Sequence, residues 1–218
     1  MGSRVRIVSL DLDGTVVSRE YVDYFWLELV PRLYAEKWGV GLEEAKRLVF
    51  AAYDEVGPGD LRWYRPAYWF ERFSFPELLD WALGEAGRLV RLYSDAASFL
   101  EAARGRVEVV ISTSASREFV DLVFKKAPAL RESVSAVFSS SSDFSLPGKP
   151  PEFFKAVLAK LGARPDEVVH VGDDPVQDYE NPRSVGIRAF LVAREVEDQR
   201  DPPGRLRSLL ELLEIIQL

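Results

Sequence analysis

The sequence predicts an α/β fold with a doubly wound, mainly parallel sheet and an inserted all-helical segment, and three observations predict it. From residue 88 onward, short runs of β-branched and apolar residues alternate with stretches of helical spacing, which is typical of strands joined by crossover helices. Another strand-like run, residues 5–10, precedes this alternation. Between the two, residues 16–87 have helical spacing without β-alternation. We therefore expect an α/β core formed by residues 1–15 and 88–218 and a helical cap formed by residues 16–87.

The first predicted strand ends at two carboxylates. Residues 5–10 are mostly β-branched or apolar, as in a buried strand, and Asp11 and Asp13 follow before Gly14 breaks the run. Aspartate and glycine are also ordinary turn residues, so an acidic turn without chemistry is the alternative. Ligands of open α/β sheets bind outside the carboxyl ends of the strands, and this position therefore favours a functional role for the two acids.

The segment after Thr15 contains two runs with the spacing of amphipathic helices, followed by an aromatic-rich stretch. A loop is expected at residues 57–60 (Gly-Pro-Gly-Asp), after the second helix. The apolar positions of the first run are Tyr24, Trp26, Leu27, Val30 and Leu33, and those of the second are Leu42, Ala45, Leu48, Val49 and Ala52. The aromatic stretch is expected to form core packing, with Trp63, Tyr64 and Trp69 as candidates for substrate contact and Arg62 and Arg65 as candidates for binding a second anionic group.

The remaining sequence predicts the other elements of the core. The helix at residues 151–161 begins with Pro151, a favoured first-turn residue. A short helix after residue 174 is expected to be distorted by Pro182. The serine run at residues 139–142 is expected to be a loop. Strands are expected at residues 106–111, 134–138, 167–171 and 188–192, and helices at residues 94–103, 116–126, 151–161 and 206–218.

Composition limits the classes of function. The 218-residue chain is 47% hydrophobic and 29% charged, as in folded globular proteins. Its formal net charge of −7 disfavours nucleic acid and an anionic membrane surface as partners, because both attract basic surfaces. The absence of cysteine excludes disulfides, thiolate nucleophiles and cysteine-ligated zinc. His170 is the one histidine, so a multi-histidine metal site is not expected, and His170 itself is expected to be a hydrogen-bonded structural residue.

The sequence predicts no segment that crosses a membrane. No stretch reaches the length of a transmembrane helix, and the residues near Met1 do not form the apolar region of a signal peptide. We therefore expect a cytoplasmic protein with no membrane partner. The leucine-rich terminal helix is expected to dock on the core, and both a monomer and a homodimer are compatible with the sequence.

Further strand ends carry groups suited to chemistry. In a parallel sheet these groups lie at the same edge as Asp11 and Asp13. The alternatives are a solvated loop lysine and side chains that merely cap helices. The groups are Ser112 and Thr113 at the end of the second strand, Lys149 between a strand and a helix, and Asp173, Asp174 and Asp178 after the strand at residues 167–171.

A cluster of carboxylates at one sheet edge requires protons or a cation to compensate its negative charge. Two carboxylates about 4 Å apart repel each other by ~4 kcal/mol at an effective dielectric constant near 20. Three or more would therefore take up protons or bind a cation. Oxygen ligands favour a hard divalent ion, and Mg²⁺ with one or two carboxylates and a phosphate-bearing substrate is a common arrangement. Lys149 and Ser112 are suited to neutralise and hydrogen-bond a phosphoryl group.

These motifs resemble those of the haloacid dehalogenase (HAD) superfamily, in particular its phosphatase-like branch with a helical cap. The resemblance covers the whole predicted core, and residues 16–87 lie where the family has a mobile helical cap. It implies a Rossmann-like core and a cap that closes over the site and selects the substrate. The motifs that carry it are Asp11-Leu12-Asp13-Gly14-Thr15, then Ser112 at a strand end, then Lys149, then Gly172-Asp173-Asp174 with Asp178.

The resemblance implies roles for the acidic residues. Asp11 is expected to be the nucleophile that forms an aspartyl-phosphate, and Asp13 to protonate the leaving oxygen and then activate water. Asp11, the backbone carbonyl of Asp13, and Asp173 are expected to hold Mg²⁺. Asp174 or Asp178 is expected to contact metal-bound water or Lys149 without binding the metal directly.

The resemblance also implies how the phosphoryl group is bound. Ser112 is expected to hydrogen-bond the phosphoryl oxygens, with Thr113 or Ser114 as alternatives. Lys149 is expected to offset the charge on the nucleophile and on the phosphate. The function expected from the whole set is a Mg²⁺-dependent phosphatase that acts on a small phosphorylated metabolite.

Three other functions are alternatives to the phosphatase. A haloacid dehalogenase of the same fold also uses an aspartate nucleophile, but such enzymes lack an acid at the position of Asp13 and need no metal. A phosphomutase would have to protect the phosphoryl group from water, which the sequence does not test. A catalytically silent binding protein is disfavoured because every motif residue is chemically competent.

Overall fold

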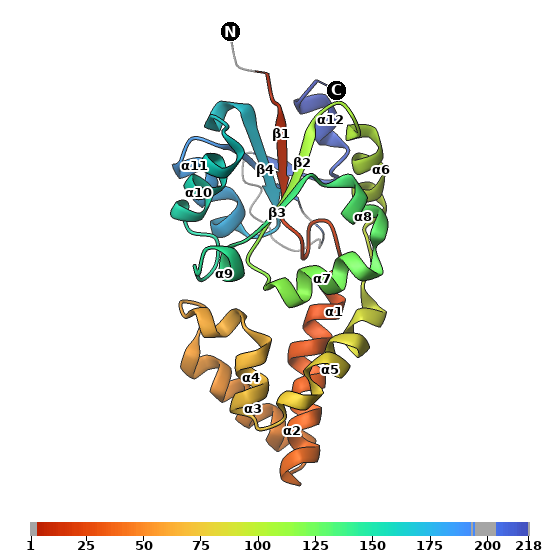
Figure 1. The fold of residues 1–218 in the computed structure, drawn as a ribbon, viewed down its shortest axis with the longest axis vertical. Helices are drawn as coiled ribbons and strands as arrows, with labels where there is room; N and C mark the ends of the chain where they lie inside the picture. Colours follow the sequence, from red (N-terminus) through yellow and green to blue (C-terminus); the bar gives the residue numbers. More distant parts are fainter. Residues whose placement is uncertain (1–3, 193, 195–203, 218) are drawn as a thin grey trace.

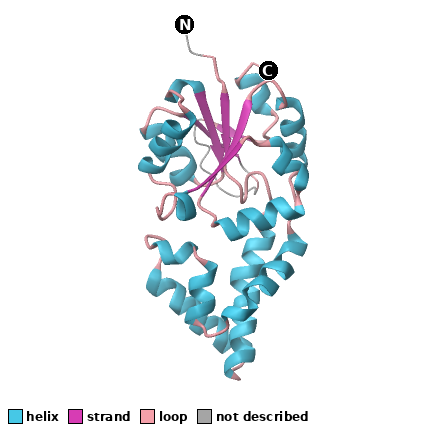
Figure 2. Cartoon of the chain, viewed as in Figure 1, coloured by secondary structure: helices cyan, strands magenta, loops and turns pink. Residues whose placement is uncertain are grey.

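The computed structural model describes residues 4–192, 194 and 204–217. A sheet with helices on both of its faces forms one end of the molecule, and a purely helical unit forms the other end (Figure 1). Figure 2 shows that the strands are confined to the first end. The described sheet has six strands in the order β3-β2-β1-β4-β5-β6, and each neighbouring pair is parallel. The predicted doubly wound α/β fold is confirmed.

Strand β1 lies at the centre of the sheet because its residues suit full burial. All four of its residues, Ile-Val-Ser-Leu, are buried, and the strand pairs with β2 on one side and β4 on the other. Ligands of such sheets bind at the carboxyl edge, where β1, β2 and β4 end side by side. The strands are β1 (Ile7–Leu10), β2 (Glu108–Thr113), β3 (Ala136–Ser139), β4 (Val168–Gly172), β5 (Arg188–Val192) and β6 (Arg205–Leu206).

Helices cover both faces of the sheet. On one face, Ile7 and Val110 pack with Phe153 and its neighbours on α10, and on the other face Val8 and Ile111 belong to the larger apolar core. This division follows the alternation of side chains along a strand. The helices of the core are α6 (Ser94–Ala103), α7 (Arg117–Lys126), α8 (Pro128–Ser133), α9 (Ser140–Asp143), α10 (Pro151–Leu161), α11 (Asn181–Ser184) and α12 (Glu211–Ile215), with a 3-10 turn η5 (Pro165–Glu167) and a π-helix η6 (Pro175–Glu180).

The helical unit leaves and re-enters the core at one place. Val17 bridges to Leu92, Ser18 N–H donates to Arg91 O over 2.9 Å, and Tyr93 N–H donates to Val16 O over 3.0 Å. An aromatic interior holds the unit together, as the composition predicts. Its elements are α1 (Glu20–Asp23), π-helix η1 (Tyr24–Leu29), α2 (Val30–Trp38), α3 (Leu42–Val56), η2 (Leu61–Tyr64), α4 (Pro66–Arg72), η3 (Pro76–Leu78), α5 (Leu79–Ala86) and η4 (Gly87–Leu89).

Two predicted elements are wrong. The serine run at residues 139–142 was expected to be a loop, but Ser139 ends β3 and caps helix α9, accepting a hydrogen bond from Ser142 N–H over 3.1 Å. The helix expected at residues 206–218 is confined to Glu211–Ile215, and residue 218 lies outside the described residues. Ahead of this helix, Arg205 and Leu206 instead form β6, because they pair with Leu191 and Val192 at the edge of the sheet.

Most other predicted elements have nearly the expected limits. The helices at residues 94–103 and 151–161 and the strand at residues 188–192 match the structure, whereas β2, β3 and β4 run one or two residues further than expected. The extensions carry β2 to Thr113 and β3 to Ser139, and that of β4 to Gly172, directly before Asp173. None of the described helices is both long and apolar enough to cross a membrane.

Candidate active site

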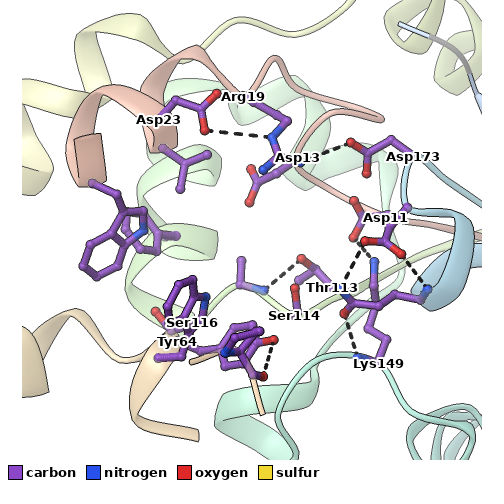
Figure 3. A pocket seen from close by; sticks show the side chains of 18 of the residues that line it. Asp11, Asp13, Arg19, Asp23, Tyr64, Thr113, Ser114, Ser116, Lys149 and Asp173 are labelled. Carbon is purple, nitrogen blue, oxygen red and sulfur yellow. Dashed lines mark hydrogen bonds and ion pairs between the residues drawn. The ribbon is translucent and has the colours of Figure 1, made fainter. Parts of the chain in front are cut away.

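A cavity of about 400 Å³ lies where the carboxyl edge of the sheet faces the helical unit. Figure 3 places Asp11, Lys149 and Asp173 at one side of this cavity. The residues of the core that line it include Asp11, Asp13, Thr113, Ser114, Lys149 and Asp173, and those of the helical unit include Trp26, Tyr53, Trp63, Tyr64 and Trp69. The structure therefore brings the predicted carboxylates and the predicted lysine into one cavity.

Asp11 and Lys149 form a buried ion pair at this side of the cavity. Lys149 Nζ donates to Asp11 Oδ1 over 2.5 Å, and both side chains are almost fully buried. Asp11 directly follows β1, and its N–H donates to Val171 O over 2.8 Å, which fixes it beside β4. Burial raises the pKa of Asp11 well above its ordinary value, and nearby carboxylates add to this effect, while Lys149 opposes it. Burial opposes the charge of Lys149, but Asp11 and Asp178 together raise its pKa.

The backbone around Lys149 is held by the segment that follows β4. Gln177 Oε1 accepts from Lys149 N–H over 2.9 Å, and Asn181 Nδ2 donates to Lys149 O over 3.0 Å. Gly148 has a φ of +63°, a conformation that L side chains rarely adopt, and an added Cβ there would lie 2.9 Å from Gln177 Oε1. The glycine before the lysine is therefore needed to turn the chain so that Lys149 enters the cavity.

Asp178 forms a second buried ion pair with Lys149. Its Oδ1 accepts from Lys149 Nζ over 2.5 Å and lies 2.9 Å from His170 Nε2, and its Oδ2 accepts from Asp174 N–H over 3.1 Å. Although burial opposes its charge, Lys149 and then His170 lower the pKa of Asp178 to about 2. Gly172 lets the Asp178 side chain pack against the end of β4, because a Cβ on Gly172 would lie 2.1 Å from Asp178 Cγ.

His170 and Ser112 lie in a buried polar layer beneath the cavity. Ser9 Oγ lies 2.9 Å from His170 Nδ1 and donates to Ser112 Oγ over 2.8 Å. Burial lowers the pKa of His170, although its contact with Asp178 opposes this effect. The expectation that Ser112 binds a phosphoryl group does not fit this geometry, because Ser112 is fully buried in this layer and is not part of the described cavity lining.

Thr113 reaches the cavity that Ser112 does not. Successive residues of a strand point to opposite faces, so Thr113 lies on the side away from Ser9 and lines the cavity together with Ser114. Thr113 Oγ1 accepts from Ala115 N–H over 3.1 Å, which leaves its own O–H as a donor. Of the two hydroxyls at the end of β2, Thr113, named as an alternative from the sequence, is therefore the one that lines the cavity.

Asp13 is held by a tyrosine that the sequence did not single out. Tyr21 OH donates to Asp13 Oδ1 over 2.5 Å, and burial raises the pKa of Asp13 to about 6 even though the Tyr21 hydrogen bond lowers it. Tyr21 lies in α1, which begins shortly after the turn that carries Asp13. No sequence signal separates Tyr21 from the other aromatic residues of the helical unit, because its role depends on the path of the chain after that turn.

Asp173 lies beside the same turn. A Cβ on Gly14, whose φ is +80°, would lie 2.1 Å from Asp173 Oδ2, so only glycine allows this approach. Arg19 Nη1 donates to Asp173 Oδ2 over 3.5 Å, and Arg19 Nε lies 3.9 Å from Asp23 Oδ1. Burial raises the pKa of Asp173, and Asp178 adds to the effect. Arg19 lines the cavity, and nothing in the sequence singled it out.

The carboxylates fit a hard metal ion. Oxygen atoms of Asp11, Asp173 and Asp178 lie within 4.8 Å of one another, and Asp11 and Asp173 have raised pKa values, which indicates charge that a cation would relieve. Asp178 already contacts Lys149, His170 and a backbone N–H, so Asp11 and Asp173 are the better ligands. Asp174 Oδ1 instead accepts from the N–H groups of Val176 and Gln177 at the start of η6.

Comparisons with known proteins identify relatives of the chain. Residues 5–186 match the family model described as a hydrolase, haloacid dehalogenase-like hydrolase. The chain is similar to the GMP/IMP nucleotidase YrfG of Escherichia coli (strain K12), with 26% identity over 189 residues that cover 86% of this chain and 82% of that protein. The family model spans most of the chain and includes every strand end that carries a predicted site residue.

Two solved structures have the same fold. The HAD phosphatase from Thermococcus onnurineus superposes with a TM-score of 0.81 at 24% identity, covering 97% of this chain and 98% of that one. The putative HAD-hydrolase YfnB from Bacillus subtilis, described as bound to magnesium, superposes with a TM-score of 0.69 at 16% identity, covering 99% and 100%. From the family model and the shared fold together, the chain belongs to the haloacid dehalogenase-like hydrolases, as the order of its motifs predicted.

Proposed function

We propose that this hydrolase is a Mg²⁺-dependent phosphatase that cleaves a small phosphate monoester through an aspartyl-phosphate intermediate. The observation that carries the proposal is the buried Asp11–Lys149 ion pair, which shares one cavity with Asp13, Thr113 and Asp173. These residues supply a nucleophile, a fixed positive charge, a proton donor, a hydroxyl donor and a metal ligand. We also propose that residues 16–87 act as the cap that covers this site.

Asp11 acts as the nucleophile in the first half of the reaction. A bond forms between an oxygen of Asp11 and phosphorus, and the bond between phosphorus and the ester oxygen breaks. Lys149, held at Asp11 and Asp178, offsets the negative charge on the phosphoryl oxygens. The Thr113 hydroxyl donates to one of these oxygens, because its acceptor side is already occupied by Ala115 N–H.

Asp13 transfers the protons. Its pKa of about 6 keeps a protonated form accessible near neutral pH, so that it can donate a proton to the leaving oxygen. The resulting carboxylate then takes a proton from the water that attacks phosphorus, which releases inorganic phosphate and restores Asp11. Tyr21 fixes the orientation of Asp13 throughout.

Asp11 and Asp173 would hold Mg²⁺, and the backbone carbonyl of Asp13 remains the third predicted ligand. When bound there, the ion supplies positive charge that lets an anionic phosphate approach the carboxylates. The carboxylate arrangement supports this assignment, and so does the likeness to a HAD-hydrolase described as bound to magnesium.

The comparisons support a phosphate monoester as the substrate class. The similar Escherichia coli protein is named as a nucleotidase, and a local match over 30% of the chain is to a phosphoserine phosphatase from Thermus thermophilus. These names share a phosphate monoester and differ in its alcohol. Asp13 and its tyrosine partner favour the phosphatase over a dehalogenase, whose leaving halide needs no proton.

The test is hydrolysis of 4-nitrophenyl phosphate with Mg²⁺ and after chelation by EDTA. We expect metal-dependent phosphate release, complete loss of turnover in Asp11→Asn, and a phosphoryl adduct on the peptide that contains Asp11 after acid quench of the wild-type reaction. Asp54→Asn changes an exposed carboxylate of α3 in the same way and should keep full activity. Wild-type turnover in Asp11→Asn, or halide release from a 2-haloacid without phosphate release, would contradict the proposal.

A further inference from the structure

The side of the cavity opposite the phosphate position is an aromatic wall. Figure 3 shows unlabelled aromatic rings on this side, away from Asp11 and Lys149. Tyr64 extends the wall toward the lysine loop, and its hydroxyl would lie 3.4 Å from a Cβ added at Gly148. The rings come from η1, α3, η2 and α4 of the helical unit and from α7 of the core, so segments far apart in the sequence converge on one surface. The aromatic wall consists of Trp26, Tyr53, Trp63, Tyr64, Trp69 and Phe119.

Contacts between its rings hold the aromatic wall in place. Tyr53 lies at its centre, edge-to-face with Trp69 at 4.7 Å, with Trp26 at 5.7 Å and with Trp63 at 6.1 Å between ring centroids. Trp69 Nε1 donates to Trp63 O over 3.2 Å, and Tyr53 OH donates to Trp26 O over 3.4 Å. The polar atoms of the two buried rings are therefore satisfied within the protein, and half-buried Trp26 and Trp63 border the cavity. Such a surface needs no rearrangement to receive a flat ring.

The charge of the cavity disfavours a phosphate ester whose alcohol part carries a second negative charge. Among the described lining residues, carboxyl groups outnumber the two cations, Arg19 and Lys149. Lys149 is engaged by two carboxylates, and Arg19 is paired with Asp173 and Asp23. Arg62 is predicted from the sequence as a candidate for binding a second anionic group. It pairs instead with Asp60 and lies outside the described lining. A second negative charge on the substrate would therefore meet repulsion and no available cation.

We propose that the substrate is the phosphate monoester of an uncharged alcohol that carries a flat aromatic ring, and that this ring stacks on the aromatic wall beside Trp63. This inference rests on the proposed phosphatase function and goes further by defining the alcohol. Nucleoside monophosphates and aryl phosphates share this chemistry, whereas esters of hydroxy acids lack it. The cavity volume of about 400 Å³ lies in the range of small-molecule sites, about 300–1,000 Å³.

Two matched pairs of substrates test the inference. Guanosine 5′-monophosphate and ribose 5-phosphate have the same leaving hydroxyl and differ by the base, so we expect kcat/KM to be about 10-fold to 100-fold higher for the nucleotide, as base–aromatic stacking provides. 2-Hydroxyethyl phosphate and 2-phosphoglycolate differ by a carboxylate, and we expect the acid to be the poorer substrate by about 10-fold or more. Phenyl phosphate is a further test substrate, an aromatic ester without a sugar. Its binding as tightly as the nucleotide would assign the wall to any aryl ring, and weaker binding would assign it to a base.

Variants of the wall show whether stacking causes the preference. Trp63→Ala should reduce kcat/KM for the nucleotide more than for ribose 5-phosphate, so that the ratio between them falls toward one, and Trp63→Phe should restore most of it. Trp81→Ala removes an exposed indole of α5 that is not part of the described lining, and it should leave both rates unchanged.

Binding to the inactive Asp11→Asn protein separates this inference from the proposed phosphatase. We expect calorimetry to give a Kd for the nucleotide about 10-fold or more below that for ribose 5-phosphate. Tighter nucleotide binding without turnover by the wild type would support the aromatic wall and overturn the phosphatase. Equal use of nucleotide and ribose 5-phosphate by an active wild type, or unchanged selectivity in Trp63→Ala, would overturn the inference and leave the phosphatase standing.

Discussion

At the scale of single residues, the site is a set of buried charges that stabilise one another. Lys149 lies between Asp11 and Asp178, and both carboxylates lie within 2.5 Å of its Nζ. Removing one partner of such a buried group leaves an uncompensated charge, which typically costs about 3–5 kcal/mol. His170 completes the arrangement by contacting Asp178 from the layer beneath. The proposed chemistry of Asp11 would therefore also depend on His170, which lies beneath the cavity and is not part of its described lining.

The two hydroxyls at the end of β2 give a prediction at this scale. Thr113→Val should lower kcat/KM by about 10²-fold, the usual effect of losing one donor to the transition state, with little change in thermal stability. Ser112→Ala should keep most of the activity and lower stability, because its hydroxyl contacts Ser9 in the buried layer. Steady-state kinetics and thermal unfolding of the two variants measure this. A larger loss of activity in Ser112→Ala would restore the role expected from the sequence.

At the scale of elements, turns decide which side chains meet. Gly14 N–H donates to Val17 O over 2.8 Å, and the N–H groups of Val16 and Val17 donate to Leu12 O. This tight turn after β1 places Asp13 near Tyr21 and opens space for Asp173 against Gly14. Similar close approaches recur at Gly148 and Gly172, so the loops around the site depend on glycines as much as on the catalytic groups.

A pair of glycine variants tests the turn after β1. Gly14→Ala and Gly39→Ala each place a side chain at a positive φ, which costs roughly 1–2 kcal/mol. Only at Gly14 does the new Cβ collide with Asp173, whereas at Gly39 nothing lies within 4 Å. Both variants should therefore have a lower Tm, but only Gly14→Ala should lose activity and the rise in Tm on adding Mg²⁺. Equal Mg²⁺ responses would show that Asp173 is not a ligand.

At the scale of the whole molecule, Asp95 links separate parts of the chain. Its carboxylate accepts two hydrogen bonds of 2.8 Å from Arg194 and one of 2.8 Å from Leu209 N–H, and Ser208 Oγ donates to it over 3.2 Å. Arg194 also donates to Thr15 O, in the segment that leads to the helical unit. Asp95 therefore ties the start of α6, the segment before α12 and the entrance to the helical unit together.

The Asp95 link predicts a pH-dependent stability. Although burial opposes its charge, Arg194 and the Leu209 N–H lower the pKa of Asp95 in the folded protein. The carboxylate therefore stabilises the fold above its unfolded pKa of about 3.9, and this contribution is lost as the pH falls through the lower folded value. Asp95→Ala should reduce the free energy of unfolding by about 1–3 kcal/mol at pH 7, and the difference from wild type should shrink toward pH 3. Urea unfolding measures both.

A matched control accompanies this prediction. Asp80→Ala removes an exposed carboxylate from the first turn of α5, so it tests the same chemical change without the link. It should alter the free energy of unfolding by less than about 0.5 kcal/mol at either pH. A deficit in Asp95→Ala that persists unchanged at acidic pH would contradict the electrostatic account.

The sequence by itself determined the fold class, the family and the residues at the strand ends. Alternation of strand-like and helix-like runs is a local signal, and so is a strand that stops at Asp11 and Asp13, so both are readable without coordinates. The position of β6 was not readable, because Arg205 and Leu206 are extended only through pairing with β5. Helical propensity in the leucine-rich terminus gives no sign of that pairing.

Only the tertiary structure decided which polar groups share the cavity. The choice between Ser112 and Thr113 depends on which face of the sheet each side chain takes, and a one-residue shift in a strand end reverses it. Arg19 and the aromatic wall line the cavity because the helical unit faces the carboxyl edge of the sheet. The pairing of Arg19 with Asp173 and the contact of Trp26 with Tyr53 join residues distant in sequence, and no local pattern of amino acids encodes such contacts.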